Sequence, residues 1–338
     1  MHWRNIWFEE KTGRLRCWWR VLLYLGMAMV TTITIMLFLA TLFLPTTTKD
    51  LTHIPLITQA LLLFIAMVST ITGFTLSGVW ASRTLENLPP YTIGISLRNQ
   101  WLRSLLVAFT VGLGMAVVLL CAMTMCHLGH LHRHTLLQHN WQMLAFAGCF
   151  CLLISVSLEV VFHGYIFQTL LRGIGPLPSL LIIAAFGAGI ECLNVKTISP
   201  IVLANAFILF ILLGMAYLRS GSLWASIGLC AGWNMSSLLL HHSATDWPFG
   251  IVSPMTFTLH GPLWLTGGPL GLDGGAIGAV GLLILLALVT YLRGGLTIES
   301  RWWEWQNLRQ LHRQPPAWDF RIGSRTYQWK LLVRDQAE

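Results

Sequence analysis

The sequence predicts an all-α polytopic membrane protein with about eight transmembrane helices, and three observations support this fold class. Hydrophobic residues make up 55% of the 338 residues and charged residues only 10%, whereas a soluble domain has about 25% charged residues. The mean hydropathy is +0.66. Apolar runs of about 17–25 residues, the length that crosses a bilayer, recur along most of the chain.

Eight apolar segments have the length of a membrane-spanning helix. The fourth is longer than a bilayer requires, which predicts that it tilts or projects from the membrane. The fifth and seventh are short and contain polar residues, so we expect other helices to surround them. The first is too long for a signal peptide and lacks a small-residue cleavage site after it. The predicted spans are 21–44, 57–80, 102–126, 142–171, 177–194, 199–218, 222–240 and 276–292.

The positive charges predict that both termini lie in the cytoplasm, because cytoplasmic loops are enriched in Lys and Arg. With this orientation, all but three of the 21 Lys and Arg lie on the cytoplasmic side; the exceptions are Lys49, Arg133 and Lys196. The net charge of +8 then faces anionic lipid headgroups. We therefore expect a bacterial inner (cytoplasmic) membrane protein whose partners include membrane lipids and no nucleic acid.

The composition along the chain predicts three parts. Residues 1–20 form a basic and aromatic cytoplasmic head, in which Trp18 and Trp19 anchor the first span at the membrane interface. Residues 21–292 form the transmembrane domain. Residues 293–338 form a cytoplasmic tail that is too short for a second enzyme domain, so we expect at most a small docked segment or a short hairpin there.

Two outer loops are rich in histidine. A His-rich tract can bind metal, but the first loop has no acid or cysteine to order such a site, so we favour a surface tract. The second loop, 241–275, combines histidines with many Gly and Pro, which predicts a structured loop or a re-entrant cap. The histidines are His127, His130, His132, His134 and His139 in the first loop, and His241, His242 and His260 in the second.

Five polar residues within the predicted spans form the candidate site. Charged groups in a span are costly and mark functional positions. Glu159 and His163 are four residues apart and share one helix face. Glu191 is the only other acid within a span, and Cys230 and Asn234 again share a face. At 1.5 Å per residue, Glu159, Glu191 and Asn234 all lie about 20 Å from the cytoplasmic ends of their helices.

Two interpretations of this convergence follow from the residue types. Carboxylate, imidazole, thiolate and amide oxygen can all bind metal ions. The same groups can also form a hydrogen-bonded polar cluster that ties the helices together. From the residue types alone we favour the polar cluster. Most of the seven cysteines lie within spans without a CxxC pair, and we expect them to be buried apolar side chains.

Several stretches resemble the CPBP family, which comprises CAAX-prenyl proteases and bacteriocin-processing enzymes and is also called the Abi family. They are "LEVVFHG" (158–164), "LLRGIGPLPSLLIIAAFG", "LLGMAYLRSGSLWASIGLCAGWN" (212–234) and the N-terminal "GRLRCWWRVLLYL". The resemblance covers most of the chain and is strongest over 150–240. It implies an intramembrane metalloprotease fold with a bundle of about eight helices.

The first family motif, Glu-Glu-x-x-x-Arg-Gly, is degenerate in this chain. The resemblance implies that the first glutamate activates water, and Leu158 stands at that position. The second glutamate is kept as Glu159, and His163 replaces the motif arginine. A leucine side chain can act neither as a base nor as a ligand.

The histidines of the other two motifs are also replaced. With Asn194 aligned to the family's second motif, Glu191 takes the histidine position, whereas a shift by one residue would put Ile190 there. The third motif, His-x-x-x-Asn, becomes Cys230 and Asn234. The resemblance thus implies Glu159 and His163 as catalytic positions, and Glu191, Cys230 and Asn234 as metal positions.

Three functions remain open at this point. Metal-assisted hydrolysis needs ligands, an open water position and a base, so we favour an inactive relative that serves as a subunit, scaffold or binding protein of a membrane assembly, with no cofactor. The alternative is an active protease with a variant zinc site, in which Glu159 or His163 acts as the base. A third possibility is an accessory subunit of an energy-converting complex with a His-ligated haem or chlorin.

Overall fold

The computed structural model describes most of the chain. The described residues are 7–8, 15–43, 56–88, 93–95, 97, 101–133, 139–193, 199–240, 255–291, 317–322 and 325–330. Of the sequence predictions, those on Lys49, His134, Asn194, Lys196, His241 and His242 lie outside these residues, as does most of the tail.

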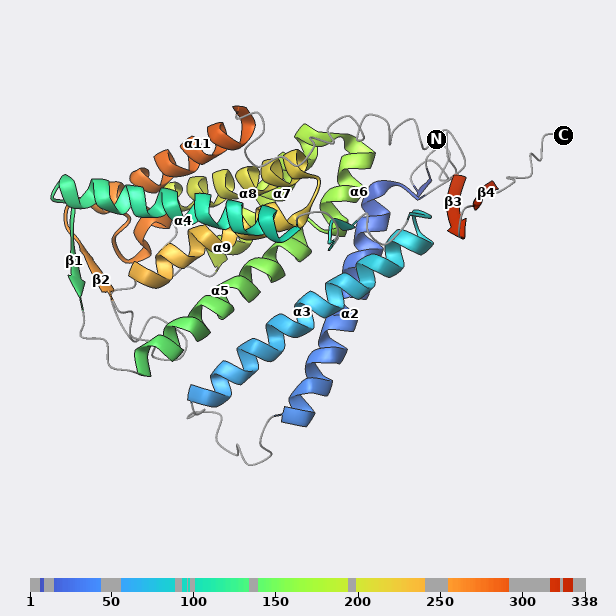
Figure 1. The fold of residues 1–338 in the computed structure, drawn as a ribbon, viewed down its shortest axis with the longest axis horizontal. Helices are drawn as coiled ribbons and strands as arrows, with labels where there is room; N and C mark the ends of the chain where they lie inside the picture. The colour runs from blue at the N-terminus through green and yellow to red at the C-terminus, as the bar shows by residue number, and fades with distance from the viewer. Residues whose placement is uncertain are drawn as a thin grey trace.

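The described part of the chain is mainly helical (Figure 1). The helices are α2 (Cys17–Phe43), α3 (Leu56–Thr84), α4 (Trp101–Met125), α5 (His139–Phe162), α6 (Tyr165–Ile174), α7 (Pro176–Leu193), α8 (Pro200–Ser220), α9 (Leu223–Leu240), α10 (Leu263–Thr266), the 3-10 helix η2 (Gly268–Gly274) and α11 (Ala276–Tyr291). The strands form two antiparallel pairs, β1 (Gly129–Arg133) with β2 (Met255–Leu259) and β3 (Ala317–Ile322) with β4 (Arg325–Lys330). The β3–β4 pair agrees with the short hairpin expected in the tail.

The all-α polytopic fold class is confirmed. Six helices among the described residues are long and apolar enough to cross a membrane. They are Cys17–Phe43, Thr58–Thr84, Trp101–Met125, Gly148–Ile174, Pro200–Ser220 and Gly268–Tyr291, and Pro176–Glu191 is a shorter apolar helix. The helix α9 coincides with the seventh predicted span but is not among the six, so the count of eight spans stays a prediction.

The fourth predicted span, 142–171, is not one continuous helix. Helix α5 ends at Phe162, His163 and Gly164 form a turn, and α6 begins at Tyr165. A side chain at position 164 would overlap the carbonyl oxygen of Val160, so the chain can make this turn only with glycine. The extra length of the span is therefore accommodated by a break next to the candidate site.

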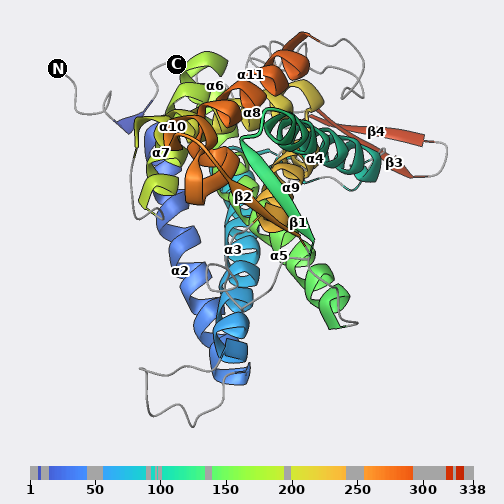
Figure 2. The same cartoon turned by 90° about the vertical axis from the view of Figure 1, so that its left-hand side faces the viewer.

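The helices pack in two groups joined through α5 (Figures 1 and 2). The long helices α2 and α3 lie side by side, while α4 packs along α9, and α8 contacts α7, α9 and α11. Helix α5 contacts both α3 and α9. The first motif therefore lies on the element that connects the two groups.

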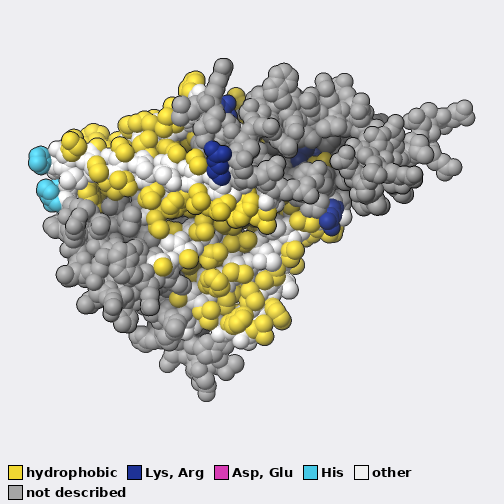
Figure 3. Space-filling view, viewed as in Figure 1, with side chains coloured by type: hydrophobic (Ala, Val, Ile, Leu, Met, Phe, Trp, Pro, Cys, Tyr) yellow, Lys and Arg dark blue, Asp and Glu magenta, His cyan; other side chains and the backbone are white. Residues whose placement is uncertain are grey.

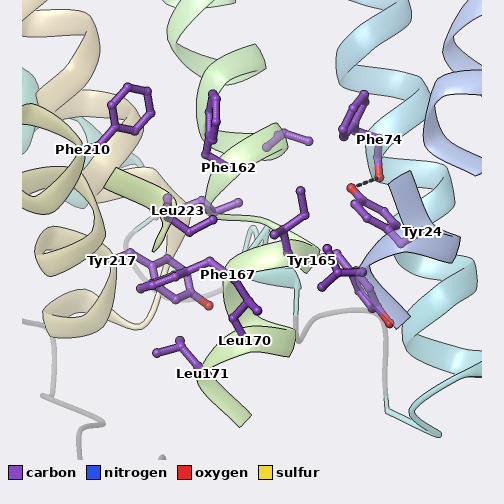
Figure 4. Close-up of a cluster of buried hydrophobic side chains, with 14 of the residues drawn as sticks. Tyr24, Phe74, Phe162, Tyr165, Phe167, Leu170, Leu171, Phe210, Tyr217 and Leu223 are labelled. Atoms are coloured by element: carbon purple, nitrogen blue, oxygen red, sulfur yellow. Dashed lines mark hydrogen bonds between the residues drawn. The ribbon is translucent and has the colours of Figure 1, made fainter. Parts of the chain in front are cut away.

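Two clusters of buried apolar side chains hold these groups together, and the first contains several aromatic rings (Figure 4). Tyr24 from α2 donates a hydrogen bond to the carbonyl oxygen of Phe74 in α3 at 3.2 Å, and its ring lies 4.5 Å from that of Tyr165 in α6. Phe167 contacts Tyr217 of α8 edge-on at 5.8 Å. Helix α6 is thus buried between the two groups, and all residues from 165 to 171 are buried.

Helices α4 and α9 approach through small residues. Beta carbons added at Gly228 and Gly232 would overlap the carbonyl oxygens of Leu105 and Phe109, respectively, and one at Gly112 would lie 2.6 Å from a carbonyl oxygen of α9. Such Gly-x-x-x-Gly spacing permits close backbone approach between membrane helices, where dispersion contacts drive association. The contact holds α9, which carries Cys230 and Asn234, against α4.

The segment 255–275, part of the second predicted outer loop, is structured, as expected. Asn205 of α8 donates from its amide nitrogen to the carbonyl oxygens of Asp273 and Gly275, both at 2.9 Å. The Trp233 indole donates to the Asp273 carboxylate at 2.7 Å. These bonds fix η2 against α8 and α9 at the end of the bundle that carries β1 and β2.

The described long-range polar contacts join segments predicted to lie on the same side of the membrane. The β1–β2 pair joins the two loops predicted to lie on the outer side. On the predicted cytoplasmic side, Glu86 contacts Arg20 and Arg172, and Arg219 donates to the carbonyl oxygen of Val289 at 3.2 Å. These pairings are compatible with the predicted orientation, which stays a prediction.

Reporter fusions test that orientation. We expect fusions after positions 49, 133, 196 and 260 to report the outer side, and fusions after positions 90, 172, 220 and 338 to report the cytoplasm, since the Lys and Arg residues favour this arrangement. Alkaline phosphatase and fluorescent-protein fusions at the same sites give opposite readouts and control for expression. A C-terminus on the outer side would contradict the eight-span topology.

Candidate functional site

Glu159 and His163 lie together at the end of α5. The carboxylate oxygen Oε2 of Glu159 is 3.0 Å from Nδ1 of His163, and both side chains are buried, with exposed fractions of 1% and 0%. The two atoms are close but are not aligned as a hydrogen bond. Within the described structure, neither carboxylate oxygen and neither imidazole nitrogen has a hydrogen-bond partner. The pair is therefore a close contact between two buried polar side chains one helical turn apart.

The imidazole of His163 is enclosed by aromatic rings. It contacts Phe167 edge-on, with ring centroids 5.3 Å apart, and stacks on Phe210 of α8 at 6.4 Å. Gly214 leaves room for it, because a beta carbon at position 214 would lie 3.3 Å from Nε2 of His163. The position at which the resemblance implies an arginine is thus filled by a shorter ring that fits between α6 and α8.

Cys230 faces the same region from α9. It is buried, it interacts electrostatically with Glu159 and Glu191, and it is in hydrogen-bonding contact with the Ser155 hydroxyl. The Asn234 amide donates to its sulfur at 3.5 Å. The structure therefore brings the predicted positions on α5, α7 and α9 within interaction range.

Sequence reasoning missed two members of this cluster. Ser155 lies one turn before Glu159 and donates to the carbonyl oxygen of Cys151 at 2.9 Å. The Cys151 side chain is also close enough to Cys230 to interact with it. Cys151, Ser155, Glu159 and His163 follow one another at intervals of four, so their shared helix face was visible in the sequence.

The side chain of Leu158 lies among other apolar side chains. It is half-buried and packs against both clusters of buried apolar side chains. A carboxylate at this position would be placed among apolar side chains, where a charge is costly. At the position where the resemblance implies a water-activating glutamate, this chain has an apolar contact between the two groups of helices.

The donor set does not fit a zinc ion. Across the described residues there is no group of three or more His, Cys, Asp or Glu side chains arranged to hold a metal. The Asn234 amide donates a hydrogen bond to the Cys230 sulfur, and Glu191 is only half-buried near the end of α7. A structural zinc site needs four ligands and a catalytic one three, so we derive no reaction step through a metal here.

A second buried polar cluster lies at the other end of α6, and sequence reasoning missed it entirely. Glu86, which follows α3, contacts Nη1 of Arg20 at 3.2 Å and Nη2 of Arg172, and it accepts a hydrogen bond from the Thr169 hydroxyl at 2.8 Å. All three charged side chains are at least 94% buried. The cluster links α2 and α3 to α6. It contains two positively charged side chains, Arg20 and Arg172, and the negatively charged Glu86.

The comparisons with known proteins identify the central part of the chain. The family described as Type II CAAX prenyl endopeptidase Rce1-like matches residues 139–236. No curated protein and no solved structure matches. The matched segment runs from the start of α5 into α9 and contains every candidate site residue described above. The segment from residue 139 to residue 236 is thus similar to the Rce1-like type II CAAX prenyl endopeptidases.

Proposed function

We propose that this protein is a catalytically inactive CPBP-family membrane protein that serves as a subunit, scaffold or binding protein of a membrane assembly. The observation that carries the proposal is the packing of Leu158 between both apolar clusters, because the family uses this position to activate water. Replacing a base by an apolar side chain removes proton transfer at this point and puts a packing contact in its place.

The exposed faces of α2 and α3 support a role in an assembly. Large apolar side chains on α2 are more than half exposed, including Leu22, Val30 and Phe38. Figure 3 shows hydrophobic side chains over much of the visible surface of the described helices. Lipid tails or neighbouring helices cover such a surface in a membrane. We propose membrane lipids and other protein subunits as partners, with the protein in a bacterial inner membrane and both termini in the cytoplasm.

An active protease with a variant site is the alternative. It is favoured by the proximity of Cys230 to Glu159 and Glu191, because a thiolate and two carboxylates are possible zinc ligands. The absence of a three-residue ligand group across the described residues speaks against it. The two functions differ in whether zinc content depends on Cys230 and Glu191.

A restoration experiment tests the proposal. We expect the purified protein to cleave no prenylated peptide, and its zinc content to be unchanged by Cys230→Ala or Glu191→Ala. The variant Leu158→Glu with Glu191→His and Cys230→His restores the family's residues, and we expect it to gain about one zinc per chain over the wild type, consistent with the three ligands of catalytic zinc sites. Elemental analysis measures the metal, and mass spectrometry measures the cleaved peptide.

The control is a variant with the Leu158→Glu change alone, which adds the base without the ligands and should gain no zinc. If the wild type holds one zinc per chain and loses it with Cys230→Ala or Glu191→Ala, the protein has a functional metal centre and the proposal is wrong. Cleavage of the peptide by the wild type would exclude the proposal as well.

A further inference from the structure

Pairing of β1 with β2 brings histidines from the two outer loops together. The rings of His130 and His260 are 5.3 Å apart between centroids and lie at 61° to each other. Both side chains are exposed, and the histidine side chains visible in Figure 3 lie at the end of the molecule where α4 leads into β1. The sequence alone favoured a surface tract because the first loop has no acid or cysteine to order a metal site, and the structure places a histidine of the second loop beside His130.

The backbone holds both histidines in place. The backbone N–H of His260 donates to the carbonyl oxygen of Leu128 at 2.8 Å, and the Thr258 hydroxyl donates to the carbonyl oxygen of His130 at 3.3 Å. Phe257, which pairs with Leu131 in the ladder, is buried, and a beta carbon at Gly129 would overlap its ring. The two imidazoles are therefore carried by an ordered strand pair, which reduces the entropy that a ligand must remove on binding.

Two neighbouring imidazoles on an ordered scaffold suit a particular class of ion. Neutral imidazole is a preferred ligand of zinc, copper and nickel, whereas calcium and magnesium require oxygen ligands. Water can fill the remaining positions around a metal at an exposed site. We propose that His130 and His260 form a surface site for a divalent transition-metal ion, which joins β1 to β2.

The site is separate from the candidate site in the membrane domain. It uses residues of the two outer loops, outside the matched segment 139–236. Since its two ligands come from strands far apart in the sequence, the unfolded chain does not hold them together. The metal therefore binds the folded protein and stabilises the strand pair by mass action. No group of three ligands occurs here among the described residues, so the protein supplies two ligands from described positions.

Metal titration of the full-length protein in detergent tests the proposal. The protein is first stripped with a chelator and then titrated with zinc in competition with a metallochromic indicator. We expect one equivalent of zinc per chain, with affinity at least tenfold lower in His130→Asn and in His260→Asn. Zinc should also raise the melting temperature of the wild type and leave that of both variants unchanged.

The matched control is His127→Asn, which alters an exposed histidine in the turn before β1 that is outside the ring pair. We expect it to bind zinc like the wild type.

Two results would overturn the proposal. One is absence of zinc binding by the stripped wild type, or equal binding by the wild type and His260→Asn. The other is loss of the bound zinc in Cys230→Ala with retention in His260→Asn, which assigns the metal to the membrane domain. Because the second result contradicts the proposed inactivity as well, while the first leaves it untouched, the two proposals fail separately.

Discussion

The substitution Glu86→Gln lowers the free energy of unfolding by about 3–5 kcal/mol, the cost typical of breaking a buried ion pair from one side. The amide keeps the size of the side chain and can still accept from Thr169, but it removes the negative charge that contacts both Arg20 and Arg172. Two guanidinium groups then stay buried without a counter-charge from the described part of the chain. Thermal and denaturant unfolding in mild detergent, followed by tryptophan fluorescence, measures the effect.

Two further variants separate charge from other effects. Arg83→Gln removes an exposed charge in the last turn of α3 and should change stability by no more than about 0.5 kcal/mol. Adding Arg20→Met and Arg172→Met to Glu86→Leu removes all three charges, and this variant should recover most of the lost stability. Equal stability of Glu86→Gln and Arg83→Gln would show that the buried cluster contributes nothing.

Leucine at both Gly228 and Gly232 prevents formation of the native bundle. Beta carbons at these positions overlap backbone carbonyl oxygens of α4, and a backbone atom cannot move aside as a side-chain tip can. Each alanine substitution alone should cost about 1–3 kcal/mol, the usual range for overpacking. The double leucine variant separates α9 from α4 and should give no monodisperse folded protein on size-exclusion chromatography.

Gly114 provides the matched control for these glycine variants. It lies on α4, and a beta carbon there meets no atom within 4 Å. Gly114→Leu should therefore elute and melt like the wild type, within about 0.5 kcal/mol. If the double variant at Gly228 and Gly232 were as stable as Gly114→Leu, close packing of α4 against α9 would not hold the bundle together.

The sequence was a good guide to the helices because hydrophobicity over some 20 residues is a strong signal. All eight predicted segments coincide with helices in the structure. The break at His163 and Gly164 was missed because the apolar run continues across it and glycine is common inside membrane helices. Whether a glycine ends a helix depends on the packing around it, which the sequence does not state.

For the polar clusters, too, the sequence predicted some features and missed others. Glu159, His163 and Cys230 were found because polar groups inside apolar spans are conspicuous. Glu86 was overlooked because it follows a span in a polar stretch that resembles an ordinary loop. Its partners Arg20 and Arg172 are 66 and 86 positions away in the chain, and each, read alone, looks like a charge at the membrane surface. Only the fold shows that the three charges meet in a buried place.

The β1–β2 pair has a consequence for biogenesis. His130 and Thr258, which face each other in this ladder, are 128 positions apart, and helices α5 to α9 lie between them in the chain. During synthesis β1 is therefore made long before its partner, and it has an unpaired edge until five more helices are inserted. Closing so long a loop is also slow relative to local helix formation. Formation of this ladder thus requires that the chain has been synthesised as far as β2, and a chain arrested before residue 255 exposes a strand that can pair with the wrong molecule.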